Sequence, residues 1–202
     1  MTCTSTDCRH NLHCFKPTPH LRQANKLGTC RRCGADLVDL RRVHRRDLAD
    51  AAYTIEALKL ELIRHKFWNV EIDAKAINHA RRKGIEGMRA AARARIRKSV
   101  GAAEPVYDGR QTPMEGSGNA IFYAQHATAT CCRRCAEYWH GIRRGRKLTE
   151  REVGYLTELV MVFVRERVPW LGAGEEGERG GSEGVSKMAA MMRRAHGERA
   201  GA

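Results

Sequence analysis

The sequence predicts a mainly α fold in which a cysteine-rich arm precedes a helical core domain. Apolar residues recur at helical spacing along residues 41–170, whereas five of the eight cysteines fall within the first 33 positions. Glycine is frequent from Leu171 onward, where charges of both signs alternate and apolar residues are sparse. We therefore expect three parts: an arm over residues 1–40, a helical core over 41–170, and a disordered tail over 171–202.

The first core helix is expected over residues 47–68. Apolar side chains recur there at spacings of three and four, as one buried helix face requires, at Leu48, Ala52, Ile55, Leu58 and Leu62. A second helix should begin after Asp73, a good N-cap residue, and end at Lys83, because Gly84 supplies a C-terminal stop.

A third helix follows, with a narrow apolar stripe made by Ile85, Met88, Ala92 and Ile96. Residues 101–119 contain proline, glycine and other turn-forming residues and should form a loop. The segment "AIFYA" after this loop is expected to be a short strand or an extended stretch.

Two further helices complete the core. Thr128 or Thr130 can cap a helix that runs through Trp139 and ends at Gly141. The last helix opens with Thr149 and Glu152, which have the spacing of a capping box, and should stop before Pro169.

Charge indicates the class of partner, and the cysteines indicate the chemistry. The formal net charge is +14, which favours nucleic acid or another polyanion, although a solvated basic face is the plainer alternative. The sequence contains no signal-peptide pattern and no apolar run long enough to span a membrane, so we expect a cytoplasmic protein without a membrane partner. Thiols stay reduced there, and clustered cysteines then indicate metal binding or catalysis.

The first cysteine group predicts a zinc site like that of a zinc ribbon. Cys30 and Cys33 form a C-x2-C turn followed by Gly34, a spacing that directs two thiolates at one ion. The expected quartet combines Cys8 and Cys14 with this pair, and it suits Zn²⁺. Because the spacing of Cys8 and Cys14 is unusual, Cys3, His10 or His13 can replace either of them.

A basic helix face is the candidate nucleic-acid surface. Arg89, Arg93 and Arg97 recur every four residues on one face, and Arg81 and Arg82 precede them. A ridge of this kind can follow a phosphate backbone. The alternative is an arginine-rich helix that only faces solvent.

The second cysteine group, "QHATATCCRRCAEYWHGI", permits three interpretations. Cys131 or Cys132 can bind Zn²⁺ with Cys135 and His126, completed by water or by a residue of the arm. Alternatively, Cys132 and Cys135 form a redox pair at a helix N-terminus. In the third interpretation the cysteines are small apolar residues of the core. His140 lies about 12 Å along a helix from Cys132 and cannot share its metal ion unless the helix breaks.

The segments "DGRQTPM", "FYAQHATATCCRRCAEYWHGI" and "LTERE" carry a resemblance to a known family. They resemble a bacterial family that is known only as a domain of unknown function, over roughly residues 60–168. The resemblance implies a short, mainly helical domain to which the cysteine arm is an extension. It implies no activity.

The same segments suggest an enzyme as the alternative to a binding protein. They would bring Asp108, Arg110, Gln111 and His126 near the cysteines, where a metal ion could support acid–base chemistry in a hydrolase or nuclease. Our first interpretation is a zinc-binding protein with one or two ions, associated with nucleic acid. A metal-dependent hydrolase comes second and a thiol oxidoreductase third.

Overall fold

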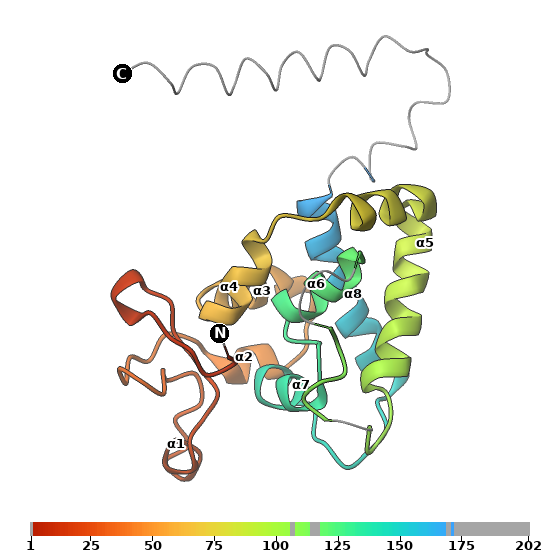
Figure 1. Ribbon diagram of the computed structural model, residues 1–202. Coiled ribbons are helices and arrows are strands. Elements are labelled where there is room, and N and C mark those ends of the chain that lie inside the picture. Colours follow the sequence, from red (N-terminus) through yellow and green to blue (C-terminus); the bar gives the residue numbers. More distant parts are fainter. Residues whose placement is uncertain (1, 106–107, 114–117, 169–170, 172–202) are drawn as a thin grey trace, which may run out of the picture. The chain divides into compact units, whose positions relative to one another are not determined.

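The computed structural model describes residues 2–105, 108–113, 118–168 and 171 (Figure 1). The expected tail therefore lies outside the described residues, apart from Leu171. Helices account for all the regular elements in the described ranges, as the mainly α prediction requires, and three isolated β-bridges are the only extended pairings there. The elements are η1 (Cys8–His10), α1 (Pro19–Gln23), α2 (Leu40–His44), η2 (Leu48–Asp50), α3 (Ala51–Lys59), α4 (Leu62–Asn69), α5 (Ala74–Val100), α6 (Ala120–Ala127), α7 (Arg133–His140) and α8 (Glu150–Arg167).

Helix α6 lies at the centre of the core, where it packs against α4, α5 and α8 (Figure 1). All but one of its side chains are buried, so the helix has no face exposed to solvent. "AIFYA" begins this helix, and the expectation of a strand was wrong. A short apolar run bounded by polar residues does not distinguish a buried helix from a buried strand.

Helix α5 contains both of the helices expected between Asp73 and Val100. The Asp73 carboxylate accepts the N–H of Ala76 at 2.8 Å, and Gly84 interrupts the helical conformation at φ 64°. Met88, Ala92 and Ile96 are fully buried on the face that packs against α6 and α8, whereas Ile85 is only partly buried, so the predicted stripe is confirmed at three of its four positions. The capping box of Thr149 and Glu152 is also present at the start of α8.

The helix expected over residues 47–68 is broken, because η2, α3 and α4 divide the segment. The second break falls at Glu61, which is extended (φ −89°, ψ 122°). His13 pairs with the backbone there: its N–H donates to the Leu60 carbonyl at 2.8 Å, and its carbonyl accepts the N–H of Leu62 at 3.0 Å. Hydrogen bonds with a segment of the arm thus separate α3 from α4.

The arm also contributes to the core through Phe15. Its ring is fully buried and meets Trp139 of α7 edge-on, at 5.9 Å between centroids and an interplanar angle of 87°. This is a favourable arrangement for two aromatic rings. None of the helices in the described ranges has the length and apolar character that crossing a bilayer demands.

Candidate metal centres

Two tight turns bring the side chains of the first cysteine group together. An antiparallel bridge between Asp7 and Leu12 closes the turn that contains η1, and a second bridge, between Thr29 and Asp36, closes the turn that contains the C-x2-C pair. Gly34 follows that pair at φ 78°, a left-handed conformation that glycine adopts without steric cost. Both turns present sulfur atoms to the same point.

The donor atoms of Cys8, His13, Cys30 and Cys33 lie within 4.8 Å of one another, and we call this group the arm centre. Three thiolates and one imidazole form a donor set typical of structural zinc sites. Cys14, the fourth cysteine of the predicted quartet, is outside the group, and His13 stands in its place. Because residue 13 is in an extended, bridged segment, the neighbouring side chain of Cys14 points to the opposite side.

The nearby Asn11 orients the ring of His13. Its Nε2 lies 3.0 Å from the Asn11 Oδ1, while its Nδ1 lies 3.5 Å from the Cys33 sulfur. Since the amide oxygen is an acceptor, Nε2 carries the proton and Nδ1 keeps its lone pair for a metal. A second residue that fixes a histidine in this way is common around metal sites.

The electrostatics of the arm centre favour the thiolate at Cys30 and the neutral thiol at Cys8. Burial opposes ionisation of Cys30, but hydrogen bonds from backbone N–H groups, including that of Arg32 at 3.4 Å, outweigh it and lower the pKa of this thiol to about 6. Burial raises the pKa of Cys8 to about 11, and hydrogen bonds with Cys33 and Cys30 add to the effect. A metal ion would replace the proton that these sulfurs share.

Cys131, Cys132 and Cys135 form a second group whose sulfur atoms lie within 4.8 Å of one another, and we call it the core centre. All three are buried. Helix α7 begins only at Arg133, with the extended Cys132 as its N-cap, so the expected threonine cap was wrong. Cys131 and Cys132 therefore approach Cys135 from the preceding turn and not along a helix face.

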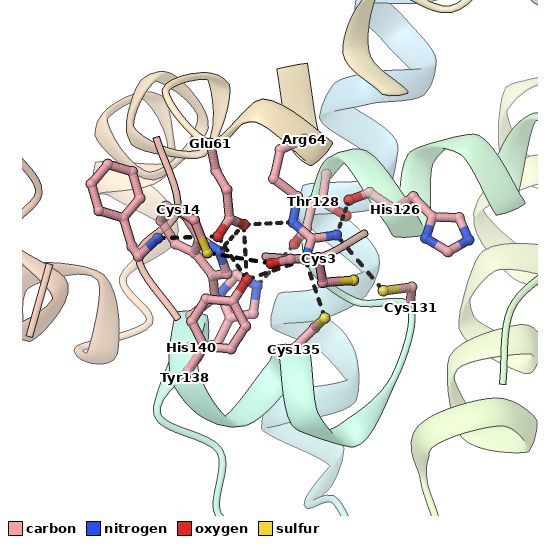
Figure 2. A network of polar contacts seen from close by, with 12 residues as sticks. Cys3, Cys14, Glu61, Arg64, His126, Thr128, Cys131, Cys135, Tyr138 and His140 are labelled. Atoms are coloured by element: carbon pink, nitrogen blue, oxygen red, sulfur yellow. Dashed lines mark hydrogen bonds and ion pairs between the residues drawn. The ribbon is translucent and has the colours of Figure 1, made fainter. Parts of the chain in front are cut away.

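A buried cation faces the core centre. The Arg64 guanidinium donates to the Cys135 sulfur at 3.1 Å and to the Cys131 sulfur at 3.8 Å (Figure 2). It also donates to Glu61 at 3.0 Å, and both side chains of this pair are fully buried. Glu61 in turn accepts hydrogen bonds from the Tyr138 hydroxyl and the Trp139 indole. Nothing in the sequence pattern singled out this network, because Glu61 and Arg64 were expected within a helix.

The two histidines of the second motif make hydrogen bonds elsewhere. The Nε2 of His126 lies 2.9 Å from the Pro113 carbonyl, and its ring stacks on Phe67 at 4.4 Å between centroids. His140 is fully buried, with Nε2 2.9 Å from the Thr128 carbonyl. Burial lowers the pKa of His126 to about 4 and that of His140 to about 3. Neither ring belongs to the group of three sulfurs.

A family model described as a domain of unknown function (DUF4186) matches residues 52–165. The chain belongs to the DUF4186 family. The match confirms the resemblance to an uncharacterised family, and it includes the core centre together with Glu61 and Arg64. The arm centre lies before the matched region of this DUF4186 protein. No solved structure matches the chain.

The other candidate catalytic groups of this DUF4186 chain are engaged in local contacts. The Asp108 carboxylate lies 3.5 Å from Arg134 and 3.4 Å from Arg144. The Gln111 side chain donates to Asp108 at 3.2 Å and accepts the N–H of Gly109 at 2.9 Å, as in a self-contained loop. These contacts do not assemble Asp108, Gln111 and His126 around the cysteines as an acid–base site.

The basic face of α5 is paired within the DUF4186 fold. Arg89 forms an ion pair with Glu158 of α8, and the Glu150 carboxylate lies 2.7 Å from Arg93 and 2.5 Å from Arg97. Arg81 and Arg82 are exposed. The ridge therefore contributes to helix packing, and its geometry lends no support to a nucleic-acid surface.

Proposed function

We propose that this protein binds zinc at two separate centres, in which the metal stabilises the fold. One observation carries the proposal: the arm brings Cys8, His13, Cys30 and Cys33 to one point, with His13 already oriented by Asn11. Three sulfurs and one nitrogen match the preference of Zn²⁺, and four protein donors leave no open position for a substrate.

The size of the arm supports a structural role for the metal. Residues 2–39 contain two short helical elements, η1 and α1, and few buried apolar side chains besides Phe15 and Val38. A segment with so small a core gains stability from a metal ion, because binding stabilises only the folded arrangement of ligands.

The geometry of the core thiols argues for metal binding over thiol redox chemistry. Three buried sulfurs, and not one pair, lie within 4.8 Å of one another. A redox-active cysteine needs a lowered pKa, whereas the pKa of Cys132 is raised to about 12, first by its hydrogen bond with Cys131, with burial adding to the effect. A metal ion bound to the three sulfurs would itself displace their protons.

Metal analysis of the purified protein tests the proposal. We expect two zinc ions per chain in the wild type, and one in each of the variants Cys30→Ser and Cys132→Ser. Cys14→Ser is the matched control, because it removes a thiol that belongs to neither centre, and it should retain both ions. A wild-type protein purified without any bound metal, and unable to take up Zn²⁺, would overturn the proposal.

A further inference from the structure

The core centre supplies three protein donors, one fewer than a closed zinc site uses. Cys131, Cys132 and Cys135 all lie on one short stretch of chain, so a fourth donor has to come from another segment. Glu61 is already committed to Arg64, Tyr138 and Trp139, while His126 and His140 bond to backbone carbonyls.

Cys3 is the remaining thiol at this place. Its side chain approaches that of Cys135 closely enough for the two thiols to influence each other, although the residues are far apart in the sequence, and its sulfur lies just outside the group of three that share one 4.8 Å neighbourhood. Figure 2 shows Cys3 beside Arg64, Cys131 and Cys135, at the point where the network of polar contacts reaches the sulfur atoms. Cys3 is half-buried, as expected for a ligand that enters the site from the surface.

Hydrogen bonds within residues 2–5 and from Cys14 hold Cys3 at this position. Residues 2–5 form a turn, with the N–H of Ser5 donating to the Thr2 carbonyl at 3.1 Å and the Thr2 N–H donating to the Ser5 hydroxyl at 3.0 Å. The Cys14 thiol donates to the Cys3 carbonyl at 3.3 Å. Cys14 is thus a positioning residue, and it lies next to His13 of the arm centre.

The charge of the surroundings suits a site with four thiolates. Zn²⁺ bound by four thiolates carries two negative charges, which a buried site tolerates only if hydrogen-bond donors and cations surround it. Arg64 provides such a cation at hydrogen-bonding distance from two of the sulfurs. Donors of this kind to metal-bound ligands are typical of metal sites.

We propose that Cys3 is the fourth ligand of the core centre, so that one zinc ion joins the N-terminal turn to the start of α7. The inference rests on the proposed function, because it takes zinc binding at Cys131, Cys132 and Cys135 as given. It extends that function by closing the site, which leaves no position for a water nucleophile. It also makes docking of residues 2–5 onto the core dependent on the metal.

Cobalt(II) replacement measures the number of thiolate ligands directly. Each thiolate bound to Co²⁺ contributes to a charge-transfer absorption band in the near ultraviolet, so the intensity reports how many sulfurs bind. We expect Cys3→Ser to lose the intensity of one thiolate bond while both ions stay bound at saturating Co²⁺. His20→Gln, a substitution at an exposed position of α1 outside both centres, is the control and should retain the full intensity.

The outcomes separate the inference from the proposed function. Equal intensity in the wild type and Cys3→Ser, with two ions bound in each, would overturn the role of Cys3 and leave two zinc centres standing. Absence of any ion that depends on Cys132 would overturn the inference together with the core half of the proposed function.

Alkylation of the wild-type chain provides a second measurement that needs no variant. Iodoacetamide should modify Cys3 slowly in the zinc-loaded protein and faster after a chelator removes the metal, because a sulfur bound to zinc is not free to act as a nucleophile. Modification of Cys3 at the same rate in both forms would overturn the proposal.

Discussion

Arg64 and Glu61 form an ion pair in which both side chains are completely buried, with 3.0 Å between Nε and the carboxylate. The pair connects the core centre with the arm. Arg64 reaches the sulfurs of the core centre, and Glu61 receives the N–H of Phe15 from the arm at 3.3 Å. A change on either side therefore alters both the core centre and the contact between the arm and the core.

Replacing Arg64 by methionine should destabilise the protein strongly. The substitution leaves the Glu61 carboxylate buried without its cation, and removal of one partner from a buried ion pair costs about 3–5 kcal/mol. We expect a loss of this size in the free energy of unfolding, measured by urea denaturation of the zinc-loaded protein. Arg42→Met, which breaks the more exposed pair with Asp50, is the matched control and should have a far smaller effect. Equal effects of the two substitutions would contradict the importance of burial.

Asn11 should control the affinity of the arm centre without being a ligand. Asn11→Gly removes the acceptor that fixes His13, and glycine tolerates the positive φ of 57° at this position. The loss of a residue that orients a metal ligand typically lowers metal affinity about 10–100-fold. Competition with a chromophoric chelator measures the change. Asn25→Gly is the control, because Asn25 has a similar φ of 53° and belongs to neither centre. An unchanged affinity in Asn11→Gly would show that His13 is oriented by other contacts.

The helices that could be predicted are those whose signals are local. The buried stripe of Met88, Ala92 and Ile96 and the capping box of Thr149 and Glu152 are each contained within one or two turns of chain. The break at Glu61 has no such signal, because neither glycine nor proline marks it. Pairing with His13, which is distant in the sequence, creates it.

The candidate sites likewise have some features that local spacing predicts and others that only the folded arm determines. The spacing of Cys30 and Cys33, and the cluster at Cys131, Cys132 and Cys135, identify sulfur groups from the sequence alone. Which of His13 and Cys14 joins the first group depends on the direction of one extended segment. The position of Cys3 beside the second group depends on how the arm folds back, and neither property is written in a local pattern.

Acid should weaken the fold through its buried histidines. The pKa of His140 is lowered to about 3 by burial, so between its ordinary value and about 3 the unfolded chain binds a proton that the folded chain does not. The free energy of unfolding then falls as the pH falls, by about 1.4 kcal/mol per pH unit from this residue. His140→Gln should reduce that slope between about pH 6 and about pH 5 relative to the wild type, as urea titrations would show.

Comparing the wild type with His140→Gln also removes the contribution of metal release to the pH dependence of stability. Both keep the same sulfur and nitrogen ligands, so release of zinc in acid adds the same slope to each. His20→Gln, a substitution at an exposed position of α1, is the surface control. Identical slopes in the wild type and His140→Gln would show that His140 is protonated in the folded state over this range.

Gly141 should be intolerant of a side chain for a reason that Gly145 does not share. Both residues have positive φ, 65° and 77°, so alanine brings similar backbone strain at each. A Cβ at residue 141 would lie 2.8 Å from the Cγ of His44, whereas one at residue 145 would meet nothing within 4 Å. His44 cannot move away freely, because its Nε2 is 3.1 Å from the Tyr138 carbonyl. We therefore expect Gly141→Ala to lower the free energy of unfolding by about 1–3 kcal/mol more than Gly145→Ala does. Equal losses in thermal or urea unfolding would mean that α2 yields to the added methyl group, and that its contact with α7 is looser than the distances imply.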